Sequence, residues 1–567
     1  MDFQKLVNIY EQLEKISSGN EIREILSDFF KQVPKDDIAL VSYLTLGKLG
    51  SEFESPVLGL AEKSVVRSIA KVSGVSEKKV KEITQKRGDA GLAAEELLKK
   101  KPQTLIPVGK LSIHEFFDVL HKIANTSGSG SQDTKSNLLV GILQKVSPIG
   151  GKYLIRIVLG TLRMGVGEMT VLDSLAIAYT GEKKNKEYLE KAFNICPDVG
   201  EIAFIVASNG LKGLEKIRIH VGTPIKMMLA QRVQELTDLE KKMPGEVSVE
   251  GKYDGERIQC HKNKKGKIKL FSRRLDTITS QFPDLVKYLE KVKAKEFVIE
   301  GEVLAIDEKG KPLPFQTLMQ RRRKHEIEKY VKDVPIILKV FDVLYVDGKS
   351  YLHSPYAERS IILDKIITGE KIIVADKIIT SDLDKINDFF LKMLDQGYEG
   401  IMIKNLQGEY QAGTRGWNWI KWKKEYVKDM VDNFDLVIVG AYYGRGRRSG
   451  GYGALLCACY DAKNDEYLTL CKVGTGFTDE MLAALPKKLD KYKTENKPGL
   501  VRIKKEMEPD VWFEPKIVVE VLAAELTKSP YHTAGLALRF PRFIRIREDK
   551  KADQSTTLKE VKEIYGK

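Results

Sequence analysis

The sequence predicts a multidomain protein with an all-α first part, an α+β second part and a small β-barrel as its third part. Apolar residues recur at steps of three and four up to about residue 220, which is the spacing of amphipathic helices. Runs rich in Val and Ile follow, and then short strand-like runs separated by turn residues. The 567 residues are too many for one hydrophobic core. We therefore expect domains at 1–220, 221–427 and 428–567.

The first part is predicted to be helical from stretches such as FQKLVNIYEQL, EIREILSDFF and IHEFFDVLHKIA. A Gly/Ser-rich loop is expected from Asn125 to Ser136, between two helices. Two interpretations of this loop stand equal: a plain linker, or a loop whose backbone amides and Lys135 grip a phosphate.

The second part is predicted to alternate strands and helices. Strand candidates are EFVIEGEVLAID, VPIILKVFDVLYVDG and EGIMIKN, and QFPDLVKYLEKVKAK is a helical stretch between them. From about 428, the runs FDLVIVGAYYG, GALLCACYD, EYLTLCKVGTG and KIVVEVLAAEL predict a barrel of about five strands. A Gly- and Arg-rich loop at Gly444–Gly453 separates two of them.

Composition favours a polyanionic partner. The net charge is +15, and each contact between a cation and a phosphate releases counterions, so nucleic acid is favoured over a basic surface that binds nothing. The five cysteines form no CxxC zinc pattern, and Cys457 and Cys459 are expected to be core residues. No apolar run reaches the roughly 20 residues that span a bilayer. The first residues predict an amphipathic helix instead of a signal peptide, so we expect a soluble, cytoplasmic protein without a membrane contact.

The strongest chemical signal is the segment from Glu250 to Arg257, which contains a KxDG tetrapeptide at Lys252–Gly255. Alone it is weak, because Asp-Gly also suits a hairpin turn. Its weight comes from an ordered series of further motifs: Phe271–Arg274, Val298–Glu302, Lys339–Asp342, Glu399–Lys404, Tyr410–Arg415, Trp419–Lys423 and Arg542–Lys550.

This series contains the parts of a phosphoryl-transfer site. An uncharged lysine amine attacks phosphorus when burial and neighbouring cations lower its pKa. Arg257, Arg273, Lys421 and Lys423 are candidates for those cations, and the alternation of the two lysines puts both on one face of a strand.

Glu302 and Glu399 are candidate Mg²⁺ ligands, although each acid alone could be a solvated residue at a strand end. Phe341 and Tyr253 could equally be core residues, Arg415 a surface residue and Lys404 a solvated charge at a strand end.

Taken together, the motifs resemble the six ordered motifs of the covalent nucleotidyltransferases, the superfamily of DNA ligases, RNA ligases and mRNA capping enzymes. Their order and spacing are similar to those of ATP-dependent DNA ligases, most of all the archaeal and eukaryotic replicative type. The tail FPRFIRIREDKKADQSTT and the helical segments HKIANTSGSGSQDTKSNLL and YLIRIVLGTLRMGVGEMTVLDSLA also fit this group. The resemblance implies a helical DNA-binding domain, an adenylation domain and an OB-fold domain.

The resemblance also implies roles for individual residues. Lys252 would carry AMP, Glu250 would accept a hydrogen bond from adenine, and Phe341 would stack on the base. Arg257 would contact the ribose or the DNA phosphate, Arg273 the ribose and phosphate side of the nucleotide, and Glu302 the ribose or the metal. The other implied contacts are the metal for Glu399, the α-phosphate for Lys421 and Lys423, support of the pocket for Lys404 and Arg415, the pyrophosphate for Arg547, Asp549 and Lys550, and DNA for Lys135, Arg163 and Arg274.

The implied activity is the sealing of nicks in duplex DNA with ATP and Mg²⁺ (or Mn²⁺), in replication, repair and recombination. A monomer is expected, with a domain closure about a linker near Lys428. At Gln103–Ile106 a plain turn between helices is favoured over a sliding-clamp contact, because Ile106 and Pro107 stand where two aromatics are usual. The rival interpretations are an RNA ligase or capping-type enzyme, which would act on RNA ends or GTP, and a basic nucleic-acid clamp, which would form no AMP adduct.

Overall fold

The computed structural model describes residues 1–99, 111–233, 235–322, 327–424, 432–444 and 451–565. The candidate clamp contact at Gln103–Ile106, the linker near Lys428 and most of the Gly444–Gly453 loop lie outside these residues. Among the described helices, none is both long and apolar enough to cross a bilayer.

The first part of the chain is built from helices, as predicted, and one hydrophobic core joins them. In α1, Asp2 caps the first turn, and Phe3, Leu6, Tyr10 and Leu13 form a buried stripe at helical spacing. The helices are α1 (Phe3–Glu14), α2 (Gly19–Gln32), α3 (Ile38–Thr45), α4 (Glu62–Ser73), α5 (Glu77–Arg87), α6 (Ala90–Leu98), α7 (Ile113–Asn125), α8 (Ser131–Lys145), α9 (Pro148–Val158), α10 (Glu168–Thr180), α11 (Lys186–Ile195) and α12 (Val199–Leu214).

The Gly/Ser-rich loop is shorter than predicted. Helix α7 ends at Asn125 and α8 already begins at Ser131, so Lys135 lies in a helix and not in a loop. Its side chain is buried, and its ammonium donates to the Leu58 carbonyl at 2.8 Å. The proposed phosphate grip by Lys135 is therefore corrected, because this ammonium already has a buried partner inside the helical part.

The middle part contains two sheets that face each other. The first has the strand order β1 (Leu229–Arg232), β11 (Arg415–Lys423), β10 (Gly400–Asn405), β2 (Val247–Lys252) and β9 (Lys377–Thr380). The second has the order β4 (Ile268–Ser272), β3 (Glu256–Lys262), β5 (Phe297–Ala305), β6 (Ile336–Val346) and β7 (Lys349–Ser350), with β8 (Ile372–Val374) also pairing with β6. The helices of this part are α13 (Asp238–Lys242), α14 (Pro283–Leu289), α15 (Phe315–Leu318), α16 (Ile327–Asp333), α17 (Tyr356–Ile366) and α18 (Leu383–Asp395).

The KxDG segment is not a hairpin turn. Strands β2 and β3 on its two sides belong to different sheets, so the segment crosses from one sheet to the other. Gly255 is needed there for close approach, since a Cβ atom on it would lie 2.2 Å from the Val303 carbonyl oxygen of β5. Lys252 is consequently placed at the point where the two sheets meet.

The C-terminal part has more strands than the five or so that the sequence predicts. An eight-stranded sheet contains β12 (Asp432–Tyr443), β13 (Tyr452–Asp461), β14 (Glu466–Val473), β15 (Lys493–Thr494), β16 (Val501–Arg502), β17 (Val511–Phe513), β18 (Val518–Ala523) and β21 (Arg542–Ile546). A separate hairpin joins β19 (Glu525–Lys528) to β20 (Leu536–Arg539), and the described residues of this part also form the α-helices α19 (Asp479–Leu489) and α20 (Leu558–Tyr565). Cys457 and Cys459 are buried in its core, as expected.

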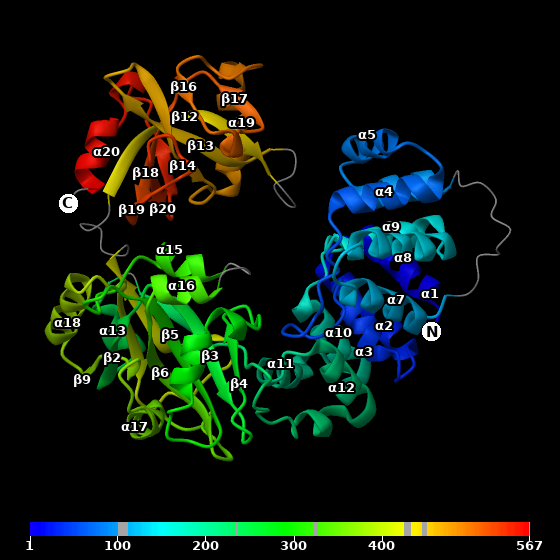
Figure 1. The fold of residues 1–567 in the computed structure, drawn as a ribbon, viewed down its shortest axis with the longest axis horizontal. Helices are drawn as coiled ribbons and strands as arrows, with labels where there is room; N and C mark the ends of the chain where they lie inside the picture. Colours follow the sequence, from blue (N-terminus) through cyan, green and yellow to red (C-terminus); the bar gives the residue numbers. More distant parts are fainter. Residues whose placement is uncertain (100–110, 234, 323–326, 425–431, 445–450, 566–567) are drawn as a thin grey trace.

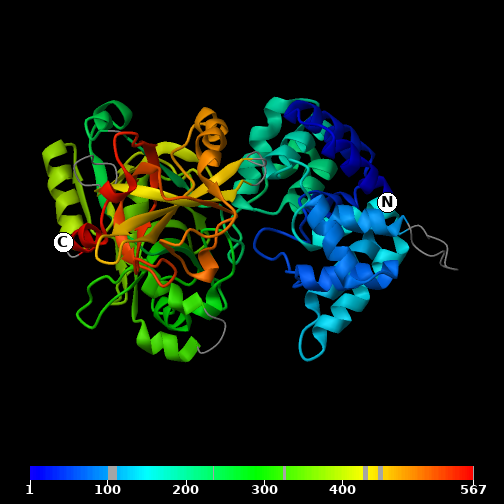
Figure 2. The same cartoon turned by 90° about the horizontal axis from the view of Figure 1, so that it is seen from above.

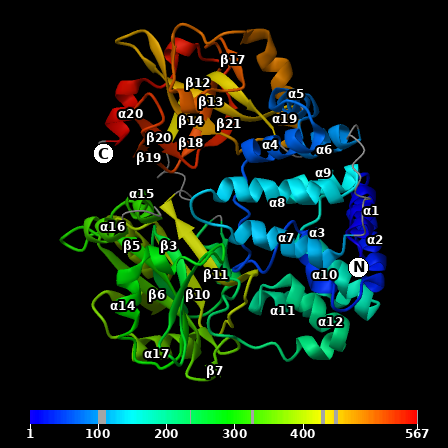
Figure 3. The same cartoon turned by 45° about the vertical axis from the view of Figure 1, so that its right-hand side comes forward.

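The helical part lies to one side of the other two, and α11 lies beside the middle part in two views (Figures 1 and 3). There Lys226 pairs with Glu168 of α10 at 2.7 Å, and its backbone N–H donates to Asn194 of α11. Seen from above, the C-terminal sheet lies over the middle part (Figure 2). The β19–β20 hairpin forms the lower edge of the C-terminal part and faces the two sheets (Figure 1).

Candidate active site

A cavity of about 710 Å³ lies between the two sheets of the middle part, a size that suits a nucleotide. The register of β2, β10 and β11 arranges one wall in rows. Lys252, Gly400 and Lys423 form the first row, Glu250, Met402 and Lys421 the second, and Ser248, Lys404 and Trp419 the third. Because alternate residues of a strand share a face, the KxDG lysine and the lysine pair meet on one wall.

Lys252 is held by an acid that follows it far along the chain. Its amine lies 2.5 Å from the Glu399 carboxylate, which also pairs with Lys423, and the Glu399 N–H donates to the Lys252 carbonyl at 2.9 Å. Burial alone would raise the pKa of Glu399, but the two lysines hold it below its ordinary value. The acid is therefore ionised and keeps both amines at the same end of the cavity.

Lys421 adds a further positive charge to this wall. Burial lowers the pKa of Lys421, and the positive charges of Lys423, Lys252 and Arg415 lower it further. Such mutual repulsion indicates cations gathered closely enough to bind a phosphate between them.

Glu302 and Arg257 stand opposite each other on β5 and β3 of the second sheet, which forms the facing wall. Burial raises the pKa of Glu302 to about 7, although Lys252 and Arg257 act in the other direction. On β5, odd-numbered residues such as Ile299 and Val303 pack in the core behind the sheet, which turns Glu302 toward the cavity.

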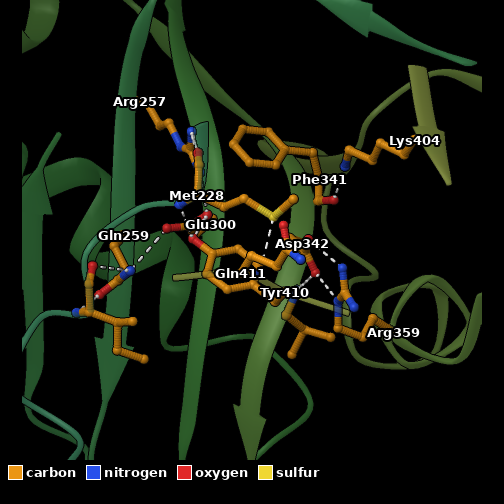
Figure 4. Close-up of polar contacts among 12 residues, drawn as sticks. Met228, Arg257, Gln259, Glu300, Phe341, Asp342, Arg359, Lys404, Tyr410 and Gln411 are labelled. Atoms are coloured by element: carbon orange, nitrogen blue, oxygen red, sulfur yellow. Dashed lines mark hydrogen bonds and ion pairs between the residues drawn. The ribbon is translucent and has the colours of Figure 1, made fainter. Parts of the chain in front are cut away.

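Arg257 lines the cavity, but its guanidinium is already bound. It donates to a Glu300 oxygen and to the Met228 carbonyl, each at 2.7 Å, and lies over the Phe341 ring. Figure 4 shows Phe341 between Arg257 and Lys404, above the polar network centred on Glu300. Arg257 therefore packs against the Phe341 ring in the wall of the cavity.

Glu250 and Lys404 form a buried ion pair of 2.8 Å at the far end of the cavity. The Tyr356 hydroxyl also donates to the Glu250 carboxylate, and the Lys404 ammonium donates to the Phe341 carbonyl. Burial lowers the pKa of Lys404, while Glu250 opposes that shift. The cavity thus has a polar end with a fixed carboxylate and an aromatic ring beside it, which suits a nucleobase.

The remaining cations predicted for the middle part also line the cavity: Arg273, Arg274 and Arg415. Arg163, predicted to contact DNA, lies in the helical part instead, where it is exposed and bound to the Gly88 carbonyl and to Asp89.

The structure does not bring the predicted pyrophosphate group into the cavity. Arg547 and Lys550 both pair with Asp435, and Arg547 also pairs with Asp549. None of these three predicted residues is among the described residues that line the cavity.

Arg539 of the β19–β20 hairpin faces the KxDG segment in their place. Its guanidinium donates two hydrogen bonds of 2.7 Å to Asp254. Sequence reasoning did not single out Arg539 or Tyr356, because each matters only through a partner far away in the chain. The one available signal for Arg539 was its place next to the FPRFIRIREDK tail.

Lysines and arginines that gather with half-buried carboxylates around a nucleotide-sized cavity are typical of a nucleotidyltransferase. Three family models match the chain: "DNA ligase N terminus" at residues 2–176, "ATP dependent DNA ligase domain" at 227–423 and "ATP dependent DNA ligase C terminal region" at 448–550. The chain belongs to the ATP-dependent DNA ligase family.

Curated DNA ligases are similar to this chain along its whole length. DNA ligase 2 of Thermofilum pendens is 42% identical, and the match covers 100% of this chain and 97% of the relative. DNA ligase 1 of Methanosarcina mazei is 43% identical, with 100% and 99% covered. The solved structure "Pmar-Lig_PreS3" shares the fold at a TM-score of 0.57 and 19% identity, over 96% of this chain and 99% of that one.

Proposed function

We propose that Lys252 is the nucleophile of a three-step reaction that seals nicks in duplex DNA with ATP as the AMP donor. The observation that carries the proposal is the position of its amine, at the end of the cavity where Lys421 and Lys423 converge. The three parts of the chain, at 1–220, 221–427 and 428–567, serve as a helical DNA-binding domain, an adenylation domain and an OB-fold domain.

In the first step, the Lys252 nitrogen attacks the α-phosphorus of ATP. A P–N bond forms, the P–O bond to pyrophosphate breaks, and the proton of the attacking amine passes to water. Lys421 and Lys423 hold the α-phosphate and balance charge in the transition state. Glu250 accepts a hydrogen bond from the adenine amino group, and Phe341 stacks on the base.

In the second step, an oxygen of the DNA 5′-phosphate attacks the same phosphorus, and the P–N bond to Lys252 breaks. In the third, the 3′-hydroxyl attacks the adenylylated 5′-phosphate, and AMP leaves as the new phosphodiester forms. Arg273 and Arg415 contact the ribose and phosphates of the nucleotide. The cavity edge at Arg274 and the exposed Arg163 contact DNA, through backbone interactions that need no base sequence.

Glu302 and Glu399 fit a Mg²⁺ or Mn²⁺ ion. Burial raises the pKa of Glu302 to about 7, and the neighbouring carboxylates Glu399 and Asp254 also raise it, so a divalent cation would relieve the repulsion between these acids. A carboxylate oxygen is a ligand that Mg²⁺ prefers. Within the described residues no cluster of three or more potential metal-binding side chains occurs, so substrate phosphates would complete the coordination. A bound ion would neutralise negative charge on those phosphates.

Adenylation needs a second arrangement of the C-terminal domain. The pyrophosphate is oriented in the first step by Arg547, Asp549 and Lys550. In this structure, however, Arg547 and Lys550 pair with Asp435, and Asp549 pairs with Arg547. A rotation of the C-terminal domain brings them to the cavity and returns them before DNA enters. The enzyme acts as a monomer in DNA replication, repair and recombination.

The test is to incubate the protein with α-labelled ATP and Mg²⁺. We expect a covalent label on the wild type and on Lys265→Ala, which changes an exposed lysine of the β3–β4 turn, and no label on Lys252→Ala. The label should leave as AMP when nicked DNA is added, and not when GTP or RNA ends are offered. A labelled Lys252→Ala protein would refute the proposal.

A further inference from the structure

Asp376 lies in the two-residue link that joins the two sheets beside the KxDG segment. It follows β8 of the second sheet and precedes β9 of the first. The link is anchored at both ends, because the Ala375 N–H donates to the Val340 carbonyl and Lys377 pairs with Glu250 in the β9–β2 register. Asp376 therefore belongs to a fixed crossing point between the sheets.

Both neighbours of Lys252 are bonded to Asp376. The Gly251 N–H, one residue before Lys252, donates to the Asp376 carbonyl at 3.0 Å. The Tyr253 hydroxyl, one residue after it, accepts from the Asp376 N–H at 2.9 Å and donates to the Asp376 carboxylate at 3.1 Å. The Lys252 carbonyl accepts from the Glu399 N–H, so the backbone is bonded at Gly251 and Lys252 and the side chain is bonded at Tyr253.

The Asp376 carboxylate is itself held in place. Lys339 of β6, a buried residue, donates to it at 2.8 Å, and Lys339 is the register partner of Glu302. Burial would raise the pKa of Asp376, but Lys339 brings it below its ordinary value. Burial and the same carboxylate raise the pKa of Tyr253, so its hydroxyl keeps its proton and remains a donor.

We propose that Asp376 is a positioning residue for the nucleophile: its carboxylate holds the Tyr253 side chain, and through it the chain next to Lys252, so that the Lys252 amine meets the α-phosphorus in line. Asp376 is not among the described residues that line the cavity, so it acts through Tyr253 and the backbone and not on the nucleotide. Misplacement of a reacting group by about 1 Å can cost on the order of 100-fold in rate, which makes such an anchor effective.

The proposal rests on Lys252 being the nucleophile. The nucleophile role of Lys252 and the positioning role of Asp376 can be tested separately, because the reaction has separate steps. Self-adenylation needs the Lys252 amine, whereas the joining of a nick that already carries AMP on its 5′-phosphate needs no attack by Lys252. We expect Asp376→Ala to slow single-turnover self-adenylation by about 10-fold or more, while it joins a chemically pre-adenylylated nick within about twofold of the wild type.

Three further variants make the result specific. Asp376→Asn keeps an acceptor for Tyr253 and should recover part of the adenylation rate. Tyr253→Phe removes only the hydroxyl and should show the same selective loss, which covers the case in which Asp376→Ala does not fold. Asp364→Asn is the matched control, because Asp364 pairs with the adjacent Lys377 but has no bond to the KxDG segment among the described residues. It should leave both rates unchanged.

The proposal would be overturned if Asp376→Ala and Tyr253→Phe adenylylated themselves at the wild-type rate. It would also be overturned if self-adenylation and the joining of the pre-adenylylated nick slowed equally, because that result indicates a general structural defect. If Lys252→Ala were adenylylated, the proposed function itself would fail. If Lys252→Ala is inactive and Asp376→Ala is normal, only the positioning role is lost.

Discussion

The ion pair between Arg539 and Asp254 is expected to hold the C-terminal domain in the arrangement that acts on DNA. It places the β19–β20 hairpin against the KxDG segment while Arg547 and Lys550 pair with Asp435. Replacement of Arg539 by leucine should therefore slow the sealing of nicked DNA by adenylylated enzyme and should not slow self-adenylation, which needs the other arrangement.

The size of the effect follows from the geometry. The pair makes two parallel hydrogen bonds of 2.7 Å, and its side chains are 20% and 27% exposed. A fully exposed pair contributes about 0–1 kcal/mol and a hydrogen bond to a charged group about 1.5–3 kcal/mol, so we expect about 1–2 kcal/mol here. That free energy corresponds to a sealing rate lower by about 5- to 30-fold.

A double-mutant cycle measures this coupling. Arg539→Leu, Asp254→Asn and the double variant are compared in single-turnover sealing by pre-adenylylated enzyme. Arg545→Leu serves as control, because Arg545 is an exposed arginine of the same domain that pairs only locally with Glu520 among the described residues. We expect the double variant to lose no more than the single ones. Additive losses, or normal sealing by Arg539→Leu, would refute the reasoning.

Four more outcomes are expected. Burial raises the pKa of Glu302 from its ordinary 4.5 to about 7, so the ligand-free fold loses stability as pH rises through this interval. In urea titrations, the free energy of unfolding of Glu302→Gln should equal that of the wild type near pH 4. Near pH 8 it should exceed the wild-type value by about 1–2 kcal/mol. Phe341→Ala should raise KM for ATP in self-adenylation about 10-fold through lost stacking, and an unchanged KM would contradict its role. Gly255→Ala should lower stability by about 1–3 kcal/mol in thermal melts, because its Cβ would meet the Val303 carbonyl at 2.2 Å, whereas Gly141→Ala, with open space around it, should not. Lys226→Ala breaks the pair with Glu168 and should weaken nick binding several-fold without slowing adenylation, and equal losses in both assays would argue against a purely inter-domain role.

Much of the fold could be predicted from local pattern. The helical part, the Val- and Ile-rich strands β5 and β6 and the shared face of Lys421 and Lys423 follow from periodicities of 3.6 and 2 residues, which depend on neighbours in the chain. The Gly/Ser-rich loop was predicted too long. Helix α8 begins at Ser131 because Asp133 suits the first turn of a helix and Gln132 and Lys135 have high helix propensity. The extra short strands of the C-terminal sheet carry too few residues for an alternation to be visible.

By itself, the sequence determined the type of most elements and the inventory of chemical groups, since motif order and residue identity are local properties. Only the tertiary structure decided that the KxDG segment crosses between two sheets, that Glu399 meets Lys252, that Asp376 anchors both neighbours of that lysine and that Arg539 reaches Asp254. Each of these contacts depends on strand pairing and register between segments far apart in the chain. Those are set by the burial of whole faces against each other, which no short stretch of residues encodes.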